Sequence, residues 1–227
     1  MPLSVVIPAL NEAAALPRTL DALMAMDGIN EVVVADGGST DTTREIARDS
    51  GCVVIEAPRG RASQMNAGAR AASGDLIFFL HADCVPPPDA AGRIGAALAD
   101  NQTSACAFSL RIDHPGVAFR VIEALANARS RLFSAPFGDQ GLALTRSAFD
   151  AVGGYPAQPL MEDVEIVRAL HRAGRVRILP ERMRASARRW LARGAVRTTL
   201  TDWRLQLAYL VLKTPPERLA RLYEDIR

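Results

Sequence analysis

Acidic side chains follow three of the apolar segments in residues 1–85, at the positions where strands are expected to end. Glu12 comes just after the first segment, Asp36 just after the second and Asp83 just after the fourth. Ligands of open α/β sheets bind at the carboxyl ends of the strands. Because Mg²⁺ and Mn²⁺ prefer oxygen ligands, the spacing predicts one concave site at this edge that tolerates a metal ion.

A second acidic pair, Glu162 and Asp163, begins a predicted helix after the proline-rich segment 155–159. A carboxylate in such a position can act as a general base toward a hydroxyl group. Acidic residues in a first helical turn are also favoured by the helix dipole alone. Spacing by itself favours this electrostatic explanation, so a catalytic role for the pair depends on the other motifs.

The elements that must position these side chains alternate regularly in the first half of the chain. The predicted strands are 4–9, 31–35, 52–56 and 76–80, and the predicted helices are 13–26, 42–50 and 63–72. The strands are almost continuously apolar, which is typical of strands buried on both faces. This repetition predicts an α/β fold with a mostly parallel central sheet flanked by helices.

The pattern changes after the three prolines at 86–88. Helices are predicted at 90–99, 117–133, 164–173, 205–213 and 216–226, and strands at 104–112, 141–145 and 176–179. We therefore predict one domain over residues 1–190, followed by a helical C-terminal tail over 191–227. Segment 203–212 of this tail is apolar on one side, which suits packing on the domain or on a second copy better than contact with a membrane surface.

The composition excludes two broad classes of protein. Of the 227 residues, 49% are hydrophobic, which excludes an intrinsically disordered chain. The sum of 27 basic and 25 acidic residues is +2, which argues against a nucleic-acid binder with a strongly basic face. Lys213 is the only lysine. The base composition of a GC-rich genome explains most of this preference for arginine, although the guanidinium also suits phosphate ligands.

The cysteines and the N-terminal segment favour a cytoplasmic protein. Cys52, Cys84 and Cys106 are odd in number and contain no CxxC pair, so neither a disulfide framework nor a zinc site is predicted. Met1 leads into an apolar segment without a basic flank, so no signal peptide is expected. No stretch reaches the roughly 18 apolar residues that a membrane span needs.

The phosphate-binding motifs GxGxxG and GxxxxGK[ST] are absent, which disfavours a dinucleotide-binding domain and a P-loop enzyme. Five other segments occur in the order VVIPALNE, VVVADGGSTDTT, RGRASQMNAGARAASGDLIFFLHAD, GGYP and MEDVEI. In this order they resemble the family-two glycosyltransferases of the GT-A fold, which are nucleotide-sugar-dependent and usually inverting enzymes. Segments PRGRASQMNAGA, FLHAD and SARRW most resemble a small single-domain subgroup labelled arsenosugar-biosynthesis glycosyltransferases.

The resemblance implies a nucleotide-binding half over residues 1–85 and an acceptor half over 100–190. The residues that it implies in nucleotide-sugar binding are Pro8, Ala9, Asn11, Glu12, Asp36, Arg61, Asp83, Arg188 and Arg189. Simpler roles remain open for some of them. Asp36 also suits a turn, Asn11 also suits a helix cap, and Arg188 and Arg189 also suit a solvated basic turn.

The segment His81-Ala82-Asp83 stands where the family has Asp-x-Asp. Asp83 matches the last aspartate, so the resemblance implies that it binds Mn²⁺ or Mg²⁺ beside the diphosphate. His81 departs from the pattern. A neutral, hydrogen-bonded histidine is expected there rather than a direct metal ligand, although Mn²⁺ accepts imidazole better than Mg²⁺ does.

The resemblance also assigns the acidic pair. Asp163 is expected to be the general base of a metal-dependent inverting transfer, and Glu162 to orient it or to contact the acceptor. The expected acceptor contacts are Asp139, Gln140 and Trp190.

The expected partners are a nucleotide-diphosphate sugar and a hydroxyl acceptor, without nucleic acid. A homodimer and peripheral contact with the inner face of the membrane are left open. Two alternative functions are a sugar nucleotidyltransferase and a non-catalytic subunit that binds a nucleotide or a sugar. The glycine-rich, arginine-containing loop of the nucleotidyltransferases is missing after the first strand, and the retention of Asp83 and Asp163 argues against a non-catalytic subunit.

Overall fold

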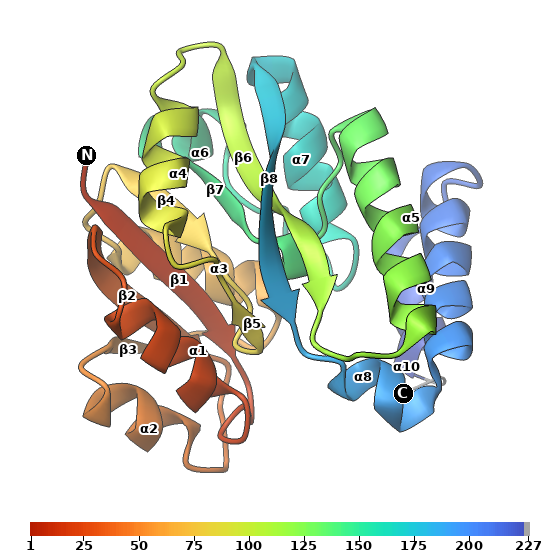
Figure 1. Ribbon diagram of the computed structural model, residues 1–227, viewed down its shortest axis with the longest axis horizontal. Helices are drawn as coiled ribbons and strands as arrows, with labels where there is room; N and C mark the ends of the chain where they lie inside the picture. The colour runs from red at the N-terminus through yellow and green to blue at the C-terminus, as the bar shows by residue number, and fades with distance from the viewer. Residues whose placement is uncertain (225–227) are drawn as a thin grey trace.

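The computed structural model of the protein describes residues 1–224 and contains an eight-stranded mixed sheet (Figure 1). The strand order is β3-β2-β1-β4-β7-β6-β8-β5. The strands are β1 (Leu3–Ala9), β2 (Ile29–Asp36), β3 (Val53–Glu56), β4 (Leu76–Phe79), β5 (Cys84–Val85), β6 (Thr103–Ile112), β7 (Leu142–Thr145) and β8 (Arg175–Ala185). Four of the seven strand pairings are parallel, so the predicted α/β fold with a mostly parallel sheet is confirmed.

Helices cover both faces of this sheet. They are α1 (Leu16–Met24), α2 (Thr43–Asp49), α3 (Arg61–Ala71), α4 (Ala90–Leu98), α5 (Val117–Phe133), α6 (Arg146–Val152), α7 (Glu162–Ala173), α8 (Arg188–Arg193), α9 (Ala195–Leu210) and α10 (Pro216–Glu224), with a 3-10 helix at Gly138–Gln140. Val5 and Ile7 point into a core shared with α1, α4 and α5, whereas Val6 points into a core shared with α3, α6 and α7. Because successive side chains of a strand alternate between faces, the continuously apolar β1 contributes to both cores.

The parallel register brings the first acidic residues to one edge. Ala9 at the end of β1 pairs with Asp36 at the end of β2, and Asp36 pairs with Glu56 at the end of β3. The first three strands therefore finish at the same level, as the sequence predicts for a site at their carboxyl ends.

Strand β8 is longer than the predicted 176–179 because Pro180 does not end it. The register against β6 jumps from Leu179, opposite Phe108, to Arg182, opposite Ser109. A bulge of this kind accommodates a residue that has no backbone N–H to donate. Beyond the bulge, β8 continues to Ala185 and leads directly into α8.

The C-terminal tail packs on the domain through part of its surface. Leu205 of α9 and Leu219 of α10 are buried in a small cluster with Met161 and Val164, beside the start of α7. Helix α9 begins ten residues earlier than the predicted 205–213, at Ala195, after Gly194 in a left-handed conformation. The predicted helix 216–226 is observed as far as 224, and its last two positions lie outside the described residues. None of the helices in the described part of the chain is long and apolar enough to cross a membrane.

Candidate active site

Asp36 is fully buried at the end of β2, where it holds the following loop. Its Oδ2 accepts hydrogen bonds from the backbone N–H groups of Gly38, at 3.0 Å, and Ser39, at 2.9 Å. The other oxygen, Oδ1, has no hydrogen-bond partner although it is buried. Since a buried acceptor without a partner is costly, this oxygen is suited to a donor group supplied by a ligand. Asp36 therefore combines the role of a turn residue with a free acceptor at the predicted nucleotide position.

Asn11 connects the loops that follow β1 and β2. Its side-chain oxygen accepts from the Thr40 backbone N–H at 2.8 Å, and its own backbone N–H donates to the Ser39 hydroxyl at 2.9 Å. Its backbone is left-handed, with φ at 54°, a conformation that asparagine tolerates better than most residues. Asn11 does not cap α1, whose N-cap is Ala15, so its observed role is to join the two loops.

Helix α3 links the ends of the parallel strands to the acidic pair of the second half. The side-chain amide of Gln64 donates to the carbonyl oxygens of Ala9, at 2.7 Å, and Ala35, at 2.9 Å. Two residues further on, Asn66 makes two hydrogen bonds with the backbone of Tyr155, at 2.8 and 2.9 Å. These side chains fix the GGYP segment against the edge of the sheet. They lie within the PRGRASQMNAGA motif, of which only Arg61 is predicted to bind the nucleotide sugar.

Arg61, in the first turn of α3, forms an ion pair with Glu162, in the first turn of α7, with 2.7 Å between Nε and Oε1. Only 2% of the Glu162 side chain is exposed, and burial raises the pKa of its carboxyl, against the opposing effect of the Arg61 charge. The ion pair therefore joins a predicted nucleotide-binding residue to a predicted catalytic residue 101 positions later. Glu162 acts here as an anchor for the start of α7.

Asp163 is half-buried and turned toward the 3-10 helix at 138–140. Its Oδ2 accepts from the backbone N–H of Gly138 at 3.2 Å, and its Oδ1 accepts from the N–H of Val164 at 2.9 Å. On the other side of Gly138 lies the ring of His81, so close that an added Cβ at Gly138 would come within 2.6 Å of Nε2. Gly138 thus lets His81 and Asp163 approach the same stretch of backbone from two sides.

His81 and Asp83, in the loop between β4 and β5, and Cys84, the first residue of β5, have ligand atoms within 4.8 Å of one another. Burial, together with the charge of Arg61, lowers the pKa of His81 to about 4, so the imidazole is neutral at neutral pH. Burial raises the pKa of the Cys84 thiol well above its usual range, so this group stays protonated. Asp83 is the one member of the three with a carboxylate, and it is partly exposed. The donor set fits a divalent ion held through Asp83, with a neutral histidine beside it.

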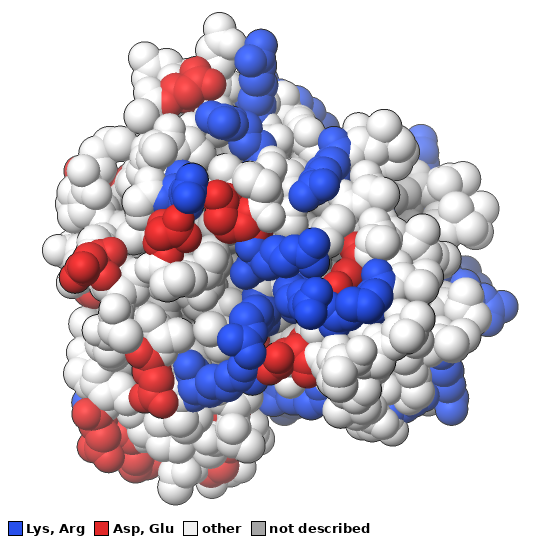
Figure 2. All heavy atoms as spheres, viewed as in Figure 1, with Lys and Arg blue, Asp and Glu red and all other residues white. Residues whose placement is uncertain are grey.

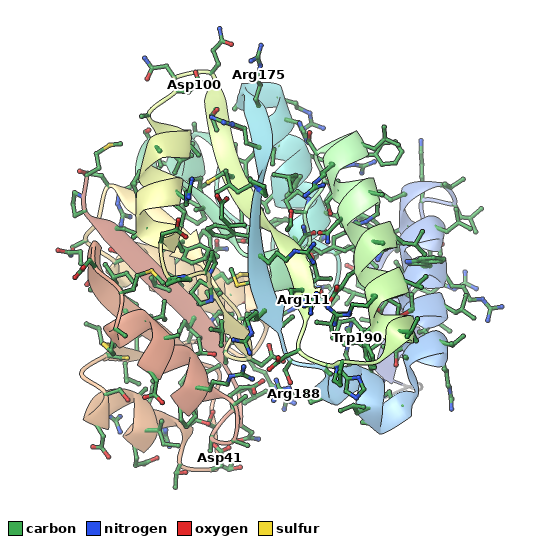
Figure 3. All side chains as sticks on the ribbon, in the orientation of Figure 1. Asp41, Asp100, Arg111, Arg175, Arg188 and Trp190 are labelled. Atoms are coloured by element: carbon green, nitrogen blue, oxygen red, sulfur yellow. The ribbon has the colours of Figure 1, made fainter. Side chains whose placement is uncertain are left out.

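Arg188, at the start of α8, reaches across to the loop after β1 and to Asp83 (Figure 3). Its Nη2 donates to Glu12 at 2.7 Å, and its Nε donates to Asp83 at 3.0 Å. The neighbouring Arg189 pairs instead with Asp202 of α9 at 2.6 Å. The structure therefore brings Glu12, Asp83 and Arg188 together, as expected, and places Arg189 next to them but on a different partner.

Asp139, in the 3-10 helix, lies close to two arginines, Arg189 and Arg129. Burial raises the pKa of its carboxyl to about 6, although the charges of Arg189 and Arg129 act in the opposite direction. The Arg129 guanidinium stacks on the ring of Phe137, 3.4 Å from the centroid, and burial lowers its pKa to about 10. Arg129 is a residue that the sequence analysis missed. It lies on α5, in a segment that belongs to none of the motifs.

Two predicted acceptor contacts need correction, because their side chains are used inside the fold. Gln140 is 1% exposed, and its amide donates to the Phe108 carbonyl at 2.8 Å and accepts from the Ser130 hydroxyl at 2.7 Å. Trp190 is 6% exposed and packs edge-on against Phe119, with ring centroids 6.5 Å apart (Figure 3). Both side chains support the framework of the site, whereas the partly exposed Asp139 remains a proposed acceptor contact.

Pro8 and Ala9 are buried in β1, and the Ala9 carbonyl accepts hydrogen bonds from the Gln64 amide, at 2.7 Å, and from the Gly37 N–H, at 2.9 Å. Asp41, in the loop before α2, accepts from the Thr43 N–H at 3.0 Å and from the Ala13 N–H at 3.2 Å. It has a structural role in starting α2.

The chain is similar in sequence to known glycosyltransferases. Residues 4–153 match the family model described as Glycosyl transferase family 2. The chain is 42% identical over 106 residues to a validoxylamine A glucosyltransferase of Streptomyces hygroscopicus, a match that covers 42% of this chain and 25% of that protein. It is 34% identical over 110 residues to a PGL/p-HBAD biosynthesis glycosyltransferase of Mycobacterium bovis, a match that covers 44% of this chain and 43% of the relative. The match thus spans less than half the length of these curated relatives.

Solved structures show the same fold at lower sequence identity. A mannosyltransferase from Pyrobaculum calidifontis, in complex with GDP-Man and Mn²⁺, superposes with a TM-score of 0.72 at 22% identity, over 93% of this chain and 64% of that one. The glucosyl-3-phosphoglycerate synthase of Mycobacterium tuberculosis gives a TM-score of 0.58 at 24% identity, over 79% and 70% of the two chains. These neighbours confirm the predicted GT-A fold. With two thirds of its length matched by the family model, the chain belongs to glycosyl transferase family 2.

Proposed function

We propose that this protein transfers a sugar from a nucleotide-diphosphate sugar to a hydroxyl acceptor, with inversion at the anomeric carbon. The observation that carries the proposal is the position of the acidic pair. The Arg61–Glu162 ion pair and the hydrogen bond from Gly138 to Asp163 fix this pair at the edge where the parallel strands end. In the proposed arrangement, a carboxylate from the second half of the chain acts beside a donor bound by the first half.

The donor is proposed to bind along the strand ends. The unpartnered Oδ1 of Asp36 would accept a hydrogen bond from the base or the ribose. Arg188 and Arg189 would pair with the diphosphate, since guanidinium groups match phosphate oxygens in geometry and charge. Glu12 holds Arg188 near this position through the hydrogen bond between Nη2 and Oε1.

A divalent ion, Mn²⁺ or Mg²⁺, is proposed to bind through Asp83. When bound, such an ion neutralises the charge of the leaving diphosphate. The structures of the Pyrobaculum mannosyltransferase and the mycobacterial synthase both contain Mn²⁺, which supports this assignment without deciding between the two ions. The neutral His81 would remain beside the ion rather than bind it.

In the proposed reaction, Asp163 takes the proton of the acceptor hydroxyl. The hydroxyl oxygen forms a bond to the anomeric carbon on the face opposite the diphosphate. The bond from that carbon to the diphosphate oxygen breaks, and the nucleoside diphosphate leaves with the electron pair. Two backbone N–H groups hold the carboxylate of Asp163 in place, which keeps one face of it directed at the acceptor side.

The acceptor is proposed to lie on the side of Asp139 and Asp163. The proposal applies to a cytoplasmic enzyme.

The experiment is incubation with a panel of nucleotide sugars in the presence of Mn²⁺, followed by measurement of the products. Slow hydrolysis that releases a nucleoside diphosphate supports the proposed transfer. Release or consumption of pyrophosphate would instead identify a sugar nucleotidyltransferase. Binding of a nucleotide sugar without turnover, with every candidate acceptor, would identify a non-catalytic binding subunit.

A further inference from the structure

Helices α5 and α9 run side by side at one end of the molecule, and both begin at the same end of the pair (Figure 1). An ordinary surface helix turns its apolar side chains inward and its polar ones outward. Both of these helices depart from this pattern, because each also exposes a row of large apolar side chains. Neither the fold nor the proposed sugar transfer explains this arrangement.

The inward side of α5 is partly polar, because Glu123, Asn127 and Ser130 are buried there beside the core residue Phe119. Glu123 accepts a hydrogen bond from the Ile112 N–H, and the Asn127 amide pairs with both the N–H and the carbonyl of Leu110, at 2.7 and 2.9 Å. Ser130, one turn later, is also buried. These side chains satisfy backbone groups of β6 that have no strand partner on that side. Three polar side chains of the helix therefore lie in the interior, where they cannot contribute to its outer surface.

The outward side of α5 is apolar from end to end. The exposed fractions are 79% for Val117, 54% for Val121, 46% for Leu125 and 77% for Leu132. At 3.6 residues per turn these four positions fall within about 80° of one another around the helix. They form a continuous stripe that faces solvent, which we call the α5 stripe.

Helix α9 carries a similar stripe. Val196, Leu200, Leu207 and Val211 are 67%, 51%, 58% and 64% exposed, and the same spacing places them within about 60° of one another. Trp203, at 45% exposure, lies beside them on the same face. These five residues are the α9 stripe. The opposite face holds the buried Thr198 and Leu205, so α9 is anchored to the domain while its apolar stripe stays uncovered.

Exposed basic side chains lie beside the two stripes. Figure 2 shows a band of basic side chains over β6 and β8 beside α5, where Arg111 and Arg182 are 44% and 55% exposed. Arg131 on α5 and Arg197 and Arg204 on α9 are also exposed. Among the side chains described between 188 and 222, Glu217 is the single exposed acidic group. Exposed basic groups therefore lie beside both stripes, although the net charge of the chain is only +2.

We propose that α5 and α9 dock the protein on a membrane surface that contains anionic phospholipids. The two stripes would enter the boundary between headgroups and acyl chains, while the arginines pair with lipid phosphates. Trp203 suits that boundary because indole has an apolar body and one polar N–H. A second copy of the chain fits less well, because a symmetric contact would bring the same arginines of both copies together.

The test is co-sedimentation of the full chain with vesicles of phosphatidylcholine alone, or of phosphatidylcholine and phosphatidylglycerol in equal amounts. We expect binding to the anionic vesicles, weakened by added salt, and little binding to phosphatidylcholine alone. The double substitution Leu125→Glu/Leu207→Glu should abolish binding. Replacing Arg197 and Arg204 by glutamine should weaken it about 25-fold, from about fivefold for each arginine.

Met24→Glu is the matched control, because Met24 is 50% exposed on α1, outside the two stripes. It adds one glutamate in place of an exposed apolar side chain, against two in the double variant, and should leave binding unchanged. All variants should keep the melting temperature and the donor hydrolysis of the original protein, since every altered side chain is on the surface. The proposal fails if the original protein does not bind anionic vesicles, or if Leu125→Glu/Leu207→Glu binds them equally well. It also fails if light scattering shows a dimer that this double substitution converts to monomers without any change in vesicle binding.

Discussion

The guanidinium of Arg188 lies on the carboxylate of Asp83, with 3.0 Å between Nε and Oδ2. The same guanidinium donates to Glu12, so three segments of the chain meet at one arginine: the loop after β1, the end of β4 and the start of α8. A metal ion that binds Asp83 must compete with Arg188 for this carboxylate. An arginine released from Asp83 then becomes available to the diphosphate, which links the binding of the ion to that of the donor.

Arg188→Ala tests this competition. Without a nucleotide, we expect the variant to bind Mn²⁺ about threefold more tightly, because a partly exposed ion pair contributes roughly 0.5–1 kcal/mol. The affinity for a nucleoside diphosphate should fall instead, since a phosphate partner is lost. Titration calorimetry measures both affinities. Arg18→Ala, which removes an exposed arginine paired with Asp113, should change neither. Weaker Mn²⁺ binding by Arg188→Ala would contradict the competition.

Arg61→Ala tests the link between α3 and α7. Removing Arg61 leaves the Glu162 carboxylate buried without its cation, and such a group costs about 2 kcal/mol. We expect the free energy of unfolding to fall by about this amount in urea denaturation. The double substitution Arg61→Ala/Glu162→Gln removes the unpaired charge and should restore part of the loss. Equal destabilisation of the single and double variants would show that the ion pair does not hold the start of α7.

Asp139→Asn tests the effect of pH on stability. The pKa of the Asp139 carboxyl is raised from its usual 3.8 to about 6, so the folded protein binds this proton more tightly than the unfolded chain does. Stability from this group is therefore present below pH 3.8 and is lost as the pH rises to about 6. The asparagine of the variant cannot ionise, so the variant does not lose this stability as the pH rises. Its unfolding free energy, relative to the original protein, should rise by on the order of 3 kcal/mol across that window. A difference that does not depend on pH would contradict the raised pKa.

The sequence predicts the first half of the fold well because its signals are local. The segments that precede Glu12, Asp36 and Asp83 are almost continuously apolar, so they are recognisable as buried strands. Since these strands pair in parallel, their carboxyl ends come together at one edge of the sheet. Strand β8 was predicted too short because Pro180 is a local signal to stop, and only the bulge opposite β6 allows the strand to continue.

The sequence predicts many residues of the candidate site, but it predicts few of the contacts that these residues make. The pairing of Arg61 with Glu162 spans 101 positions, and no local pattern encodes it. Gln64 and Asn66 bind backbone groups, and because every residue has such groups, the sequence does not indicate which ones are the partners. Gln140 was assigned to the acceptor because it lies between the two halves of the chain, and Trp190 ends the SARRW segment that carries the resemblance. The direction in which these two side chains point depends on the packing of α5 and the 3-10 helix against β6.

The most direct test of the proposed chemistry compares Asp163→Asn with the original protein in two assays, nucleoside diphosphate release from the preferred donor and donor binding by calorimetry. The substituted amide would keep a hydrogen-bond acceptor for a backbone N–H but could not take a proton. Glu165→Gln, in the same helical turn, is the control for loss of a carboxylate. The account predicts that Asp163→Asn loses about a hundredfold to ten-thousandfold in turnover with donor affinity retained, whereas Glu165→Gln keeps both. Full turnover by Asp163→Asn would contradict it.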